Sequence, residues 1–138
     1  MREPQFYLAA DSLLIVNETE VLLIRRKNEP FQGKWALPGG FVEMDETIEA
    51  GAERELWEET GIRGVSLEQF GTYGDPGRDP RGRVVGVVYW ALLTEKPKET
   101  AGDDAAEAAW FPLDALPEMA FDHDKILKDA RERMRRKK

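Results

Sequence analysis

Apolar and polar residues alternate along this chain in a way that predicts strands separated by turns. Two apolar, β-prone runs, residues 6–16 and 21–26, are divided by the turn-like sequence NETE at residues 17–20. This pattern favours two paired strands. Residues 83–93, RVVGVVYWALL, form a longer and nearly continuous apolar run, which is typical of a buried central strand.

Weaker signals complete the pattern. Residues 65–73 resemble another strand, and residues 74–82, GDPGRDPRG, have the glycines and prolines of a loop. Residues 108–113 form a short candidate edge strand, and a helix is expected from about residue 122 onward. Strands that alternate with helices predict an α/β protein, with a mixed β-sheet and helices on both faces.

A helical pattern rich in acids lies between these strands. It begins near Asp45 or Thr47, either of which could accept from free N–H groups as an N-cap. It ends at Gly61, which suits the left-handed position after a helix. A helix that begins at about residue 45 or 47 and ends at residue 61 is therefore expected.

Three glutamates of this helix, Glu55, Glu58 and Glu59, share the face that carries its inward apolar residues, at about 100° per residue. Glu49 and Glu53 project to the other side and are interpreted as ordinary surface. Like charges one turn apart on a partly desolvated face repel one another, so a cation is expected there. Oxygen ligands at this density suit Mg²⁺, or Mn²⁺ as a substitute.

Residues 40–62 have a spacing more specific than that of a general acidic helix. Gly40 is followed by five residues and Glu46, then by seven residues and REL at residues 54–56, and finally by EE at 58–59 and GI at 61–62. This spacing resembles, at every specified position, the signature of the Nudix hydrolases. Two adjacent glycines at the end of WALPGG, residues 35–40, also allow a close backbone approach to a ligand or metal. The alternative is a Glu-rich surface helix held by Arg54–Glu58 pairing.

The resemblance implies a single Nudix hydrolase domain over residues 1–138, folded as an α/β/α sandwich around a mixed sheet. In that family the glutamates matching Glu55, Glu58 and Glu59 bind one or more Mg²⁺ ions, and these ions coordinate a diphosphate. Water then attacks one phosphorus. The backbone of Gly39 and Gly40 is expected to complete the metal shell, as the double glycine suggests. Arg54 is expected to position Glu58.

The general base is left open between two places in the chain. Family members use either a glutamate inside the signature, here Glu55, or an acid on a distant loop. The downstream candidates are Asp103, Asp104 and Glu107, of which Glu107 is preferred because it lies just before the expected edge strand. His123 is interpreted as a helix-start residue, since this chemistry requires no imidazole.

Selectivity in this family lies outside the signature. Residues 30–46 and 75–83 resemble members that hydrolyse ADP-ribose, which implies cleavage to AMP and ribose 5-phosphate. The proline that such members carry at a set distance beyond the signature is not matched by Pro76 or Pro80. The alternatives are a sanitising hydrolase of oxidised or noncanonical nucleoside triphosphates, and a non-catalytic Nudix-like domain that senses a nucleotide.

Four arginines are candidate substrate contacts. Arg78 and Arg81 could clamp a phosphate or ribose by forked hydrogen bonds, although pairing with aspartates of their own loop explains them equally well. Arg25 and Arg26 end an expected strand. Because strand neighbours point to opposite faces, one of these two should face the cleft and the other solvent.

Composition and charge further narrow the class of protein to which the chain could belong. The chain has 138 residues and no cysteine, so one domain is expected, without disulfides or thiolate metal sites. Its net charge of −7 argues against nucleic-acid binding, and a basic tail at about residues 128–138 is interpreted as a solvated helix end. No apolar run reaches the about 20 residues of a membrane span and no signal-peptide layout is present, so the cytoplasm is the default location. ADP-ribose-cleaving relatives are often dimers, which leaves a homodimer open.

Overall fold

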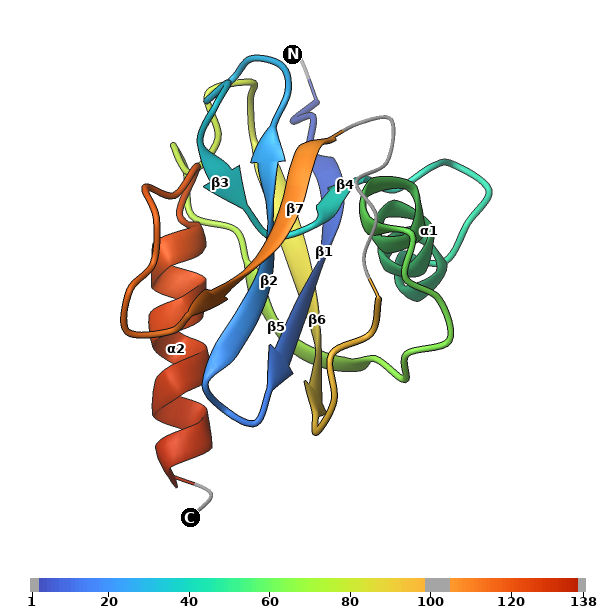
Figure 1. The fold of residues 1–138 in the computed structure, drawn as a ribbon. Coiled ribbons are helices and arrows are strands. Elements are labelled where there is room, and N and C mark those ends of the chain that lie inside the picture. The colour runs from blue at the N-terminus through green and yellow to red at the C-terminus, as the bar shows by residue number, and fades with distance from the viewer. Residues whose placement is uncertain (1–2, 99–104, 137–138) are drawn as a thin grey trace.

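Seven strands and two helices make up the computed structural model, which describes residues 3–98 and 105–136. Figure 1 shows the two helices on opposite sides of one mixed sheet, which confirms the predicted α/β/α arrangement. Neither helix in the described part of the chain is long and apolar enough to cross a membrane. In chain order the elements are β1 (Tyr7–Val16), β2 (Glu20–Arg26), β3 (Trp35–Ala36), β4 (Gly39–Phe41), α1 (Ile48–Thr60), β5 (Glu68–Tyr73), β6 (Val84–Leu93), β7 (Ala105–Pro112) and α2 (His123–Arg136).

The sheet is built around β1, which pairs in parallel with β6 over its whole length. At the end of β1 the chain reverses through Asn17 and Glu18, whose φ values of 52° and 58° are left-handed. It continues as the antiparallel strand β2, so the predicted turn at residues 17–20 is confirmed. β4 also lies antiparallel to β1 and pairs Gly39 with Asp11. This pairing carries the glycines of the signature loop onto the central strand.

The outer strands differ slightly from the sequence prediction. The order is β3-β2-β1-β6-β5, with β4 paired to β1 and β7 paired to β2. β7 begins at Ala105 and not at residue 108, because its backbone pairing with β2 extends to Arg26. β5 begins at Glu68 and not at residue 65, and Leu67 just before it is buried in the core.

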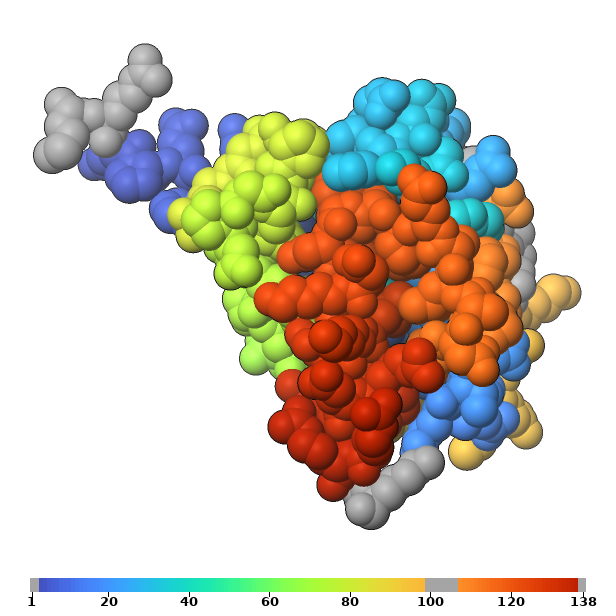
Figure 2. Space-filling view, turned by 90° about the vertical axis from the view of Figure 1, so that its left-hand side faces the viewer, coloured from blue at the N-terminus to red at the C-terminus, as the bar shows by residue number. Residues whose placement is uncertain are grey.

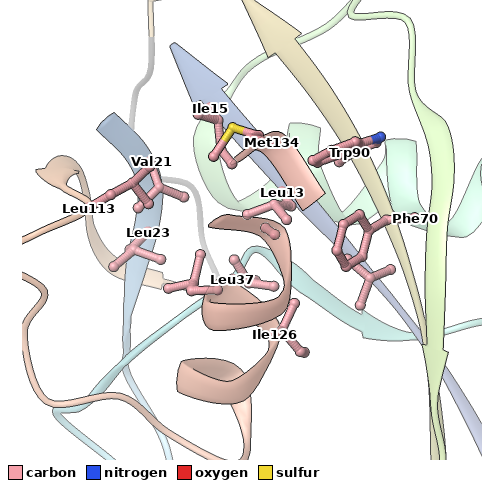
Figure 3. Close-up of a cluster of buried hydrophobic side chains, with 13 residues drawn as sticks. Leu13, Ile15, Val21, Leu23, Leu37, Phe70, Trp90, Leu113, Ile126 and Met134 are labelled. Carbon is pink, nitrogen blue, oxygen red and sulfur yellow. The ribbon is translucent and has the colours of Figure 1, made fainter. Parts of the chain in front are cut away.

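Separate apolar clusters cover the two faces of the sheet. Leu13 and Ile15 of β1 pack beneath α2 with Ile126, in the cluster shown in Figure 3. Leu14, between them, packs on the opposite face with Leu56 of α1. This alternation follows from strand geometry, and each large buried side chain contributes about 1.5–3 kcal/mol. Burial therefore fixes where α1, with its acids, sits against the sheet.

The basic end of α2, expected as a solvated helix end at about residues 128–138, is exposed at Arg131, Arg135 and Arg136 and also contacts the rest of the fold. Arg133 Nη1 donates to the Phe70 carbonyl at 2.8 Å, and Arg131 Nη1 donates to the Leu113 carbonyl at 2.9 Å. Long arginine side chains can cover apolar surface while their charged ends reach polar partners. The last turns of the helix are therefore held against the sheet.

Candidate active site

Thr47 and Gly61 set the limits of α1. The Thr47 hydroxyl accepts from the Ala50 N–H at 3.1 Å, so Thr47, and not Asp45, is the N-cap. At the other end Gly61 has a φ of 75°, and its N–H donates to the Trp57 carbonyl at 2.8 Å. Both ends agree with the helix expected from the sequence.

The acids of α1 divide between its two faces as the helical spacing predicts. Glu55 and Glu59 are 9% and 5% exposed, whereas the side chain of Glu58 is 36% exposed at the rim. Glu49 and Glu53 are exposed on the far side. Buried carboxylates are destabilising unless charged or polar partners compensate their lost hydration.

Arg54 supplies much of this compensation. Its Nη1 donates to Glu55 Oε1 at 2.7 Å and to Glu58 Oε1 at 3.1 Å, which confirms the expected Arg54–Glu58 pair. Its Nη2 and Nε form a fork onto Glu46, at 2.7 and 3.0 Å. These hydrogen bonds lower the pKa of Glu46 to about 2 and raise the pKa of Arg54. One guanidinium thus holds three carboxylates of the signature.

Two glycines bring the sheet into contact with the same acids. The Gly39 N–H donates to Glu59 Oε1 at 2.6 Å. A Cβ on Gly40 would lie 2.5 Å from Glu55 Oε2, and a Cβ on Gly39 would overlap the Asp11 carboxylate. Only glycine leaves room for so close an approach. The backbone of β4 therefore meets carboxylates from both β1 and α1.

A cavity of about 90 Å³, called the polar cavity below, opens beside this contact. Figure 2 looks onto α2 and shows the yellow-green loop of residues 74–82 and the light-blue segment of residues 27–34 on either side of the residues that precede the helix. Pockets for whole drug-sized ligands enclose about 300–1,000 Å³, so this one has room for a single fragment of a nucleotide. Its lining includes Asp11, Arg26, Gly39, Gly40, Arg78, Asp79, Arg81 and His123.

Two of the four predicted substrate arginines reach the polar cavity beside aromatic rings. The Arg81 guanidinium lies 4.6 Å from the centre of the Phe41 ring and 5.4 Å from that of Phe121. Arg26 lies 5.0 Å from the Phe121 ring centre, and burial, followed by the charge of Arg81, lowers its pKa. Arg81 also forks onto Asp79, at 3.1 and 2.8 Å. Arginine guanidinium groups thus lie at the cavity beside two aspartates, Asp11 and Asp79.

The other two arginines are placed differently. Arg25 pairs with Glu107 at 3.2 Å, and both side chains are about half exposed. Arg26 lines the cavity and Arg25 does not, as strand alternation predicts. Arg78 lines the cavity, but its side chain is only 5% exposed and its guanidinium forks onto Asp122 at 3.0 and 2.8 Å. Substrate contact by Arg25 and Arg78 stays a prediction.

Of the downstream base candidates, Glu107 alone lies within the described residues. Asp103 and Asp104 fall outside the described residues. Ala108 and Trp110 of β7 pack toward the cluster beneath α1, so alternation directs Glu107 to the opposite face. The catalytic role of Glu107 stays a prediction, and the structure does not bring it together with the helix acids.

Sequence reasoning missed two residues of the polar cavity. Asp11 is the one acid in the apolar strand β1, a signal that could have identified it. Burial raises its pKa to about 7, against the opposing charge of Arg78. His123 is the first residue of α2, as expected, yet its ring lines the cavity and its Nδ1 accepts from the Leu37 N–H at 3.0 Å.

A sequence model of the NUDIX domain matches residues 6–130. The chain belongs to the Nudix family. The predicted family, the Nudix pyrophosphohydrolases, is therefore confirmed, and α1 with its preceding loop is the Nudix signature in three dimensions.

Three known proteins are similar to this Nudix chain. The ADP-ribose pyrophosphatase of Methanocaldococcus jannaschii is 49% identical over 116 residues, which are 84% of this chain and 68% of that protein. The ADPR responsive transcriptional repressor NtrR of Acinetobacter baylyi is 41% identical over 124 residues, 87% of this chain and 50% of that protein. The NUDIX domain of Shewanella oneidensis NrtR complexed with ADP ribose has a TM-score of 0.88 and 34% identity, and covers 96% of this chain and 90% of that chain. This chain thus spans half the length of the repressor.

The donors on the Nudix helix suit a magnesium site that keeps much of its water. Within residues 3–98 and 105–136, no three acid or histidine side chains are grouped so that they could hold a metal ion on their own. Mg²⁺ rarely needs such a group, because it holds several waters and takes one or two carboxylates from protein. Glu55, Glu58 and Glu59 carry hard oxygen donors near the backbone of Gly39 and Gly40, and this chemistry fits a divalent metal of the kind that Nudix hydrolases use.

Replacing Arg54 with methionine tests the carboxylate network. The variant lacks the fork on Glu46, so we expect the pKa of Glu46 to rise from about 2 toward its ordinary 4.5. The measurement is a metal-free pH titration of the Glu46 carboxyl carbon by NMR. Arg63→Met, which changes an exposed arginine beyond the helix, should leave the titration as in the wild type. A Glu46 pKa still near 2 in the Arg54 variant would contradict the network.

His123 is the only histidine in the chain, so its ring signals can be followed directly by NMR. Burial lowers its pKa from 6.5 to about 4. The unfolded chain takes up this proton below about pH 6.5 and the folded chain only near pH 4. The contribution of His123 to the free energy of unfolding should therefore fall as pH drops through this window, by up to about 3 kcal/mol. Proton uptake by Asp11, whose pKa is raised to about 7 in the folded chain, acts in the opposite direction.

Urea unfolding at pH 7 and pH 4.5 measures this effect. The contribution of His123 is the difference between the wild type and His123→Asn, because asparagine does not titrate: on going from pH 7 to pH 4.5 the free energy of unfolding should change less favourably in the wild type than in the variant. Ring signals that titrate near pH 6.5 in the folded protein would show that the imidazole is not held neutral.

Proposed function

We propose that this Nudix protein is a divalent-metal-dependent hydrolase that cleaves ADP-ribose to AMP and ribose 5-phosphate. The acid face of α1, which carries Glu55, Glu58 and Glu59, adjoins the polar cavity, and the two share the backbone of Gly39 and Gly40. This junction is the observation that carries the proposal. A diphosphate at the acids would place one of its substituents in the cavity. The similarity to a pyrophosphatase named for ADP-ribose supports the same substrate.

In this proposal Glu55, Glu58, Glu59 and the backbone of Gly40 hold Mg²⁺, with Mn²⁺ as a substitute. The metal, when bound, neutralises charge on the diphosphate oxygens and lowers the pKa of a coordinated water. Arg54 holds Glu55 and Glu58 in place, and this is its proposed contribution to catalysis. Fixed ligand geometry matters because phosphoryl transfer depends mainly on positioning and electrostatics.

Two arginines of the polar cavity have a distinct proposed role. Arg26 and Arg81 lie over the Phe121 ring, and these cation–π contacts help to hold both guanidinium groups in place. They attract an anionic substrate to a chain whose net charge is −7. Arg78, which is buried on Asp122, is proposed to hold the loop that presents Arg81.

Glu55 is our proposed general base. It lies on the acid face, where it accepts from Arg54 and sits against Gly40. Glu107 is on another surface with Arg25 as its partner. A base must come within hydrogen-bond reach of the attacking water, directly or through one water, and Glu55 meets that condition for a diphosphate held at α1.

A product-resolved hydrolysis assay with Mg²⁺ tests the proposed function. The wild type should convert ADP-ribose to AMP and ribose 5-phosphate. Glu58→Gln should lower kcat by about 100-fold or more, the scale seen when a group that stabilises transition-state charge is removed. The matched control is Glu49→Gln, the same substitution on the exposed face of α1, which should retain wild-type kcat.

Each alternative function has its own outcome in that assay. Preferred turnover of an oxidised nucleoside triphosphate to monophosphate and pyrophosphate would identify a sanitising hydrolase. Tight ADP-ribose binding without turnover would identify a nucleotide sensor, a reading that the similarity to a transcriptional repressor makes worth testing. Equal losses in the Glu58 and Glu49 variants would contradict the assignment of the acid face.

Glu107→Gln distinguishes the two positions for the base. Removing a general base lowers kcat by about 10²–10⁴-fold, whereas breaking an exposed ion pair changes stability by about 1 kcal/mol or less. We expect unchanged kcat in Glu107→Gln and in Arg25→Gln, which removes the same ion pair from its other side. A loss confined to Glu107→Gln would place the base on β7.

A further inference from the structure

Two polar side chains in the polar cavity are nearly enclosed by protein and yet have polar atoms without a protein partner. Asp11 is 6% exposed and His123 is 4% exposed. Neither lies on the acid face of α1, and neither has a role in the cleavage proposed above. Buried polar groups are normally hydrogen-bonded, so an open one calls for an explanation.

Asp11 contributes an open acceptor. Within the described ranges its carboxylate accepts no hydrogen bond. Every polar side-chain atom that is fully enclosed in those ranges has a hydrogen-bond partner, so the Asp11 oxygens are not fully enclosed. The carboxylate oxygens must therefore reach the cavity that Asp11 lines. Its neighbour Gly39 has no side chain that could cover them.

His123 contributes an open donor. The Leu37 N–H donates to Nδ1 at 3.0 Å, so Nδ1 is the acceptor and Nε2 carries the ring proton. Among the described residues Nε2 has no hydrogen-bond partner, and because it is not fully enclosed it opens on the cavity. A backbone group thus fixes the tautomer that presents an N–H to a ligand.

A carboxylate and an N–H at one small cavity fit a group that both donates and accepts. The neighbouring hydroxyls of a ribose offer O–H donors to the carboxylate and oxygen acceptors to the N–H, and carboxylates bind ribose hydroxyls in this way in other nucleotide sites. An ionised phosphate offers no donor to Asp11. The cavity adjoins the contact between Gly39 and α1, so the sugar bonded to the diphosphate reaches it before a base does.

We propose that Asp11 and His123 bind the vicinal hydroxyls of a ribose attached to the scissile diphosphate, and that they select ribose over 2-deoxyribose. This assignment rests on the proposed nucleoside diphosphate substrate. His123 is a specificity-determining residue in it, with Nε2–H as the donor. Asp11 is the acceptor for the same sugar.

Two substitutions at His123 separate its structural role from its contact with ligand. In His123→Asn the short amide reaches only the position of Nδ1, so it can still accept from the Leu37 N–H but presents no donor to the cavity. In His123→Gln the longer amide reaches the position of Nε2 and can restore the donor. Asp11→Asn replaces the acceptor on the other side with an isosteric amide, and it serves if a His123 variant does not fold.

Calorimetric binding of two matched pairs tests the proposal. The pairs are ribose 5-phosphate with 2-deoxyribose 5-phosphate, and AMP with 2′-deoxy-AMP, all with Mg²⁺ present. None of them contains a diphosphate to cleave. The wild type should bind the ribose member of one pair about tenfold more tightly, the scale of a favourable hydrogen bond. The pair that shows this preference identifies which ribose of the substrate enters the cavity.

The variants give the decisive comparison. His123→Asn and Asp11→Asn should bind both members of that pair equally while their melting temperatures show intact folds, and His123→Gln should regain part of the preference. Glu49→Gln should behave as the wild type. A wild type that binds the members of both pairs equally, or binds none, overturns the proposal. So does a preference that survives in both His123→Asn and Asp11→Asn. If ADP-ribose is not hydrolysed but the preference and its loss are observed, the proposed function fails and the ribose site stands.

Discussion

The hydrogen bond from the Gly39 N–H to Glu59 joins the central sheet directly to the acid face of α1. It can form only because residues 39 and 40 have no side chains, since a Cβ at Gly40 would meet the Glu55 carboxylate. The same backbone segment pairs with β1 and brings Asp11 to the same place. One close approach therefore sets both the acid face and the floor of the neighbouring cavity, so the two cannot move independently.

Charge balance at this contact explains why a cation belongs there. Arg54 is shared among Glu46, Glu55 and Glu58, which leaves the group negatively charged before Glu59 is counted. Arg54 is able to order these carboxylates and cannot neutralise them. In the proposed function a divalent ion would supply the missing charge, and the diphosphate of the substrate would balance the ion in turn. Arg26 and Arg81 extend this balance into the polar cavity with charges that remain on the protein.

Local chemistry made much of this structure predictable from the sequence. The spacing of acids along α1 predicted which of them are buried, and the caps at Thr47 and Gly61 follow from residue type. Alternation along β2 predicted that the side chains of Arg25 and Arg26 point to opposite faces of the sheet. The polar cavity was not predictable in this way. Asp11 and His123 come from opposite ends of the chain and meet only through strand pairing and the docking of α2, and neither periodicity nor a local motif records such a contact.

The most direct test of the account is a crystal structure of the Glu58→Gln variant with ADP-ribose and Mg²⁺. The account predicts a diphosphate and metal at Glu55, Glu59 and the Gly39–Gly40 backbone, with a ribose in the polar cavity and one of its hydroxyls within hydrogen-bond distance of His123 Nε2. A ligand whose diphosphate lies away from α1, or whose cavity substituent is the adenine base, would contradict it.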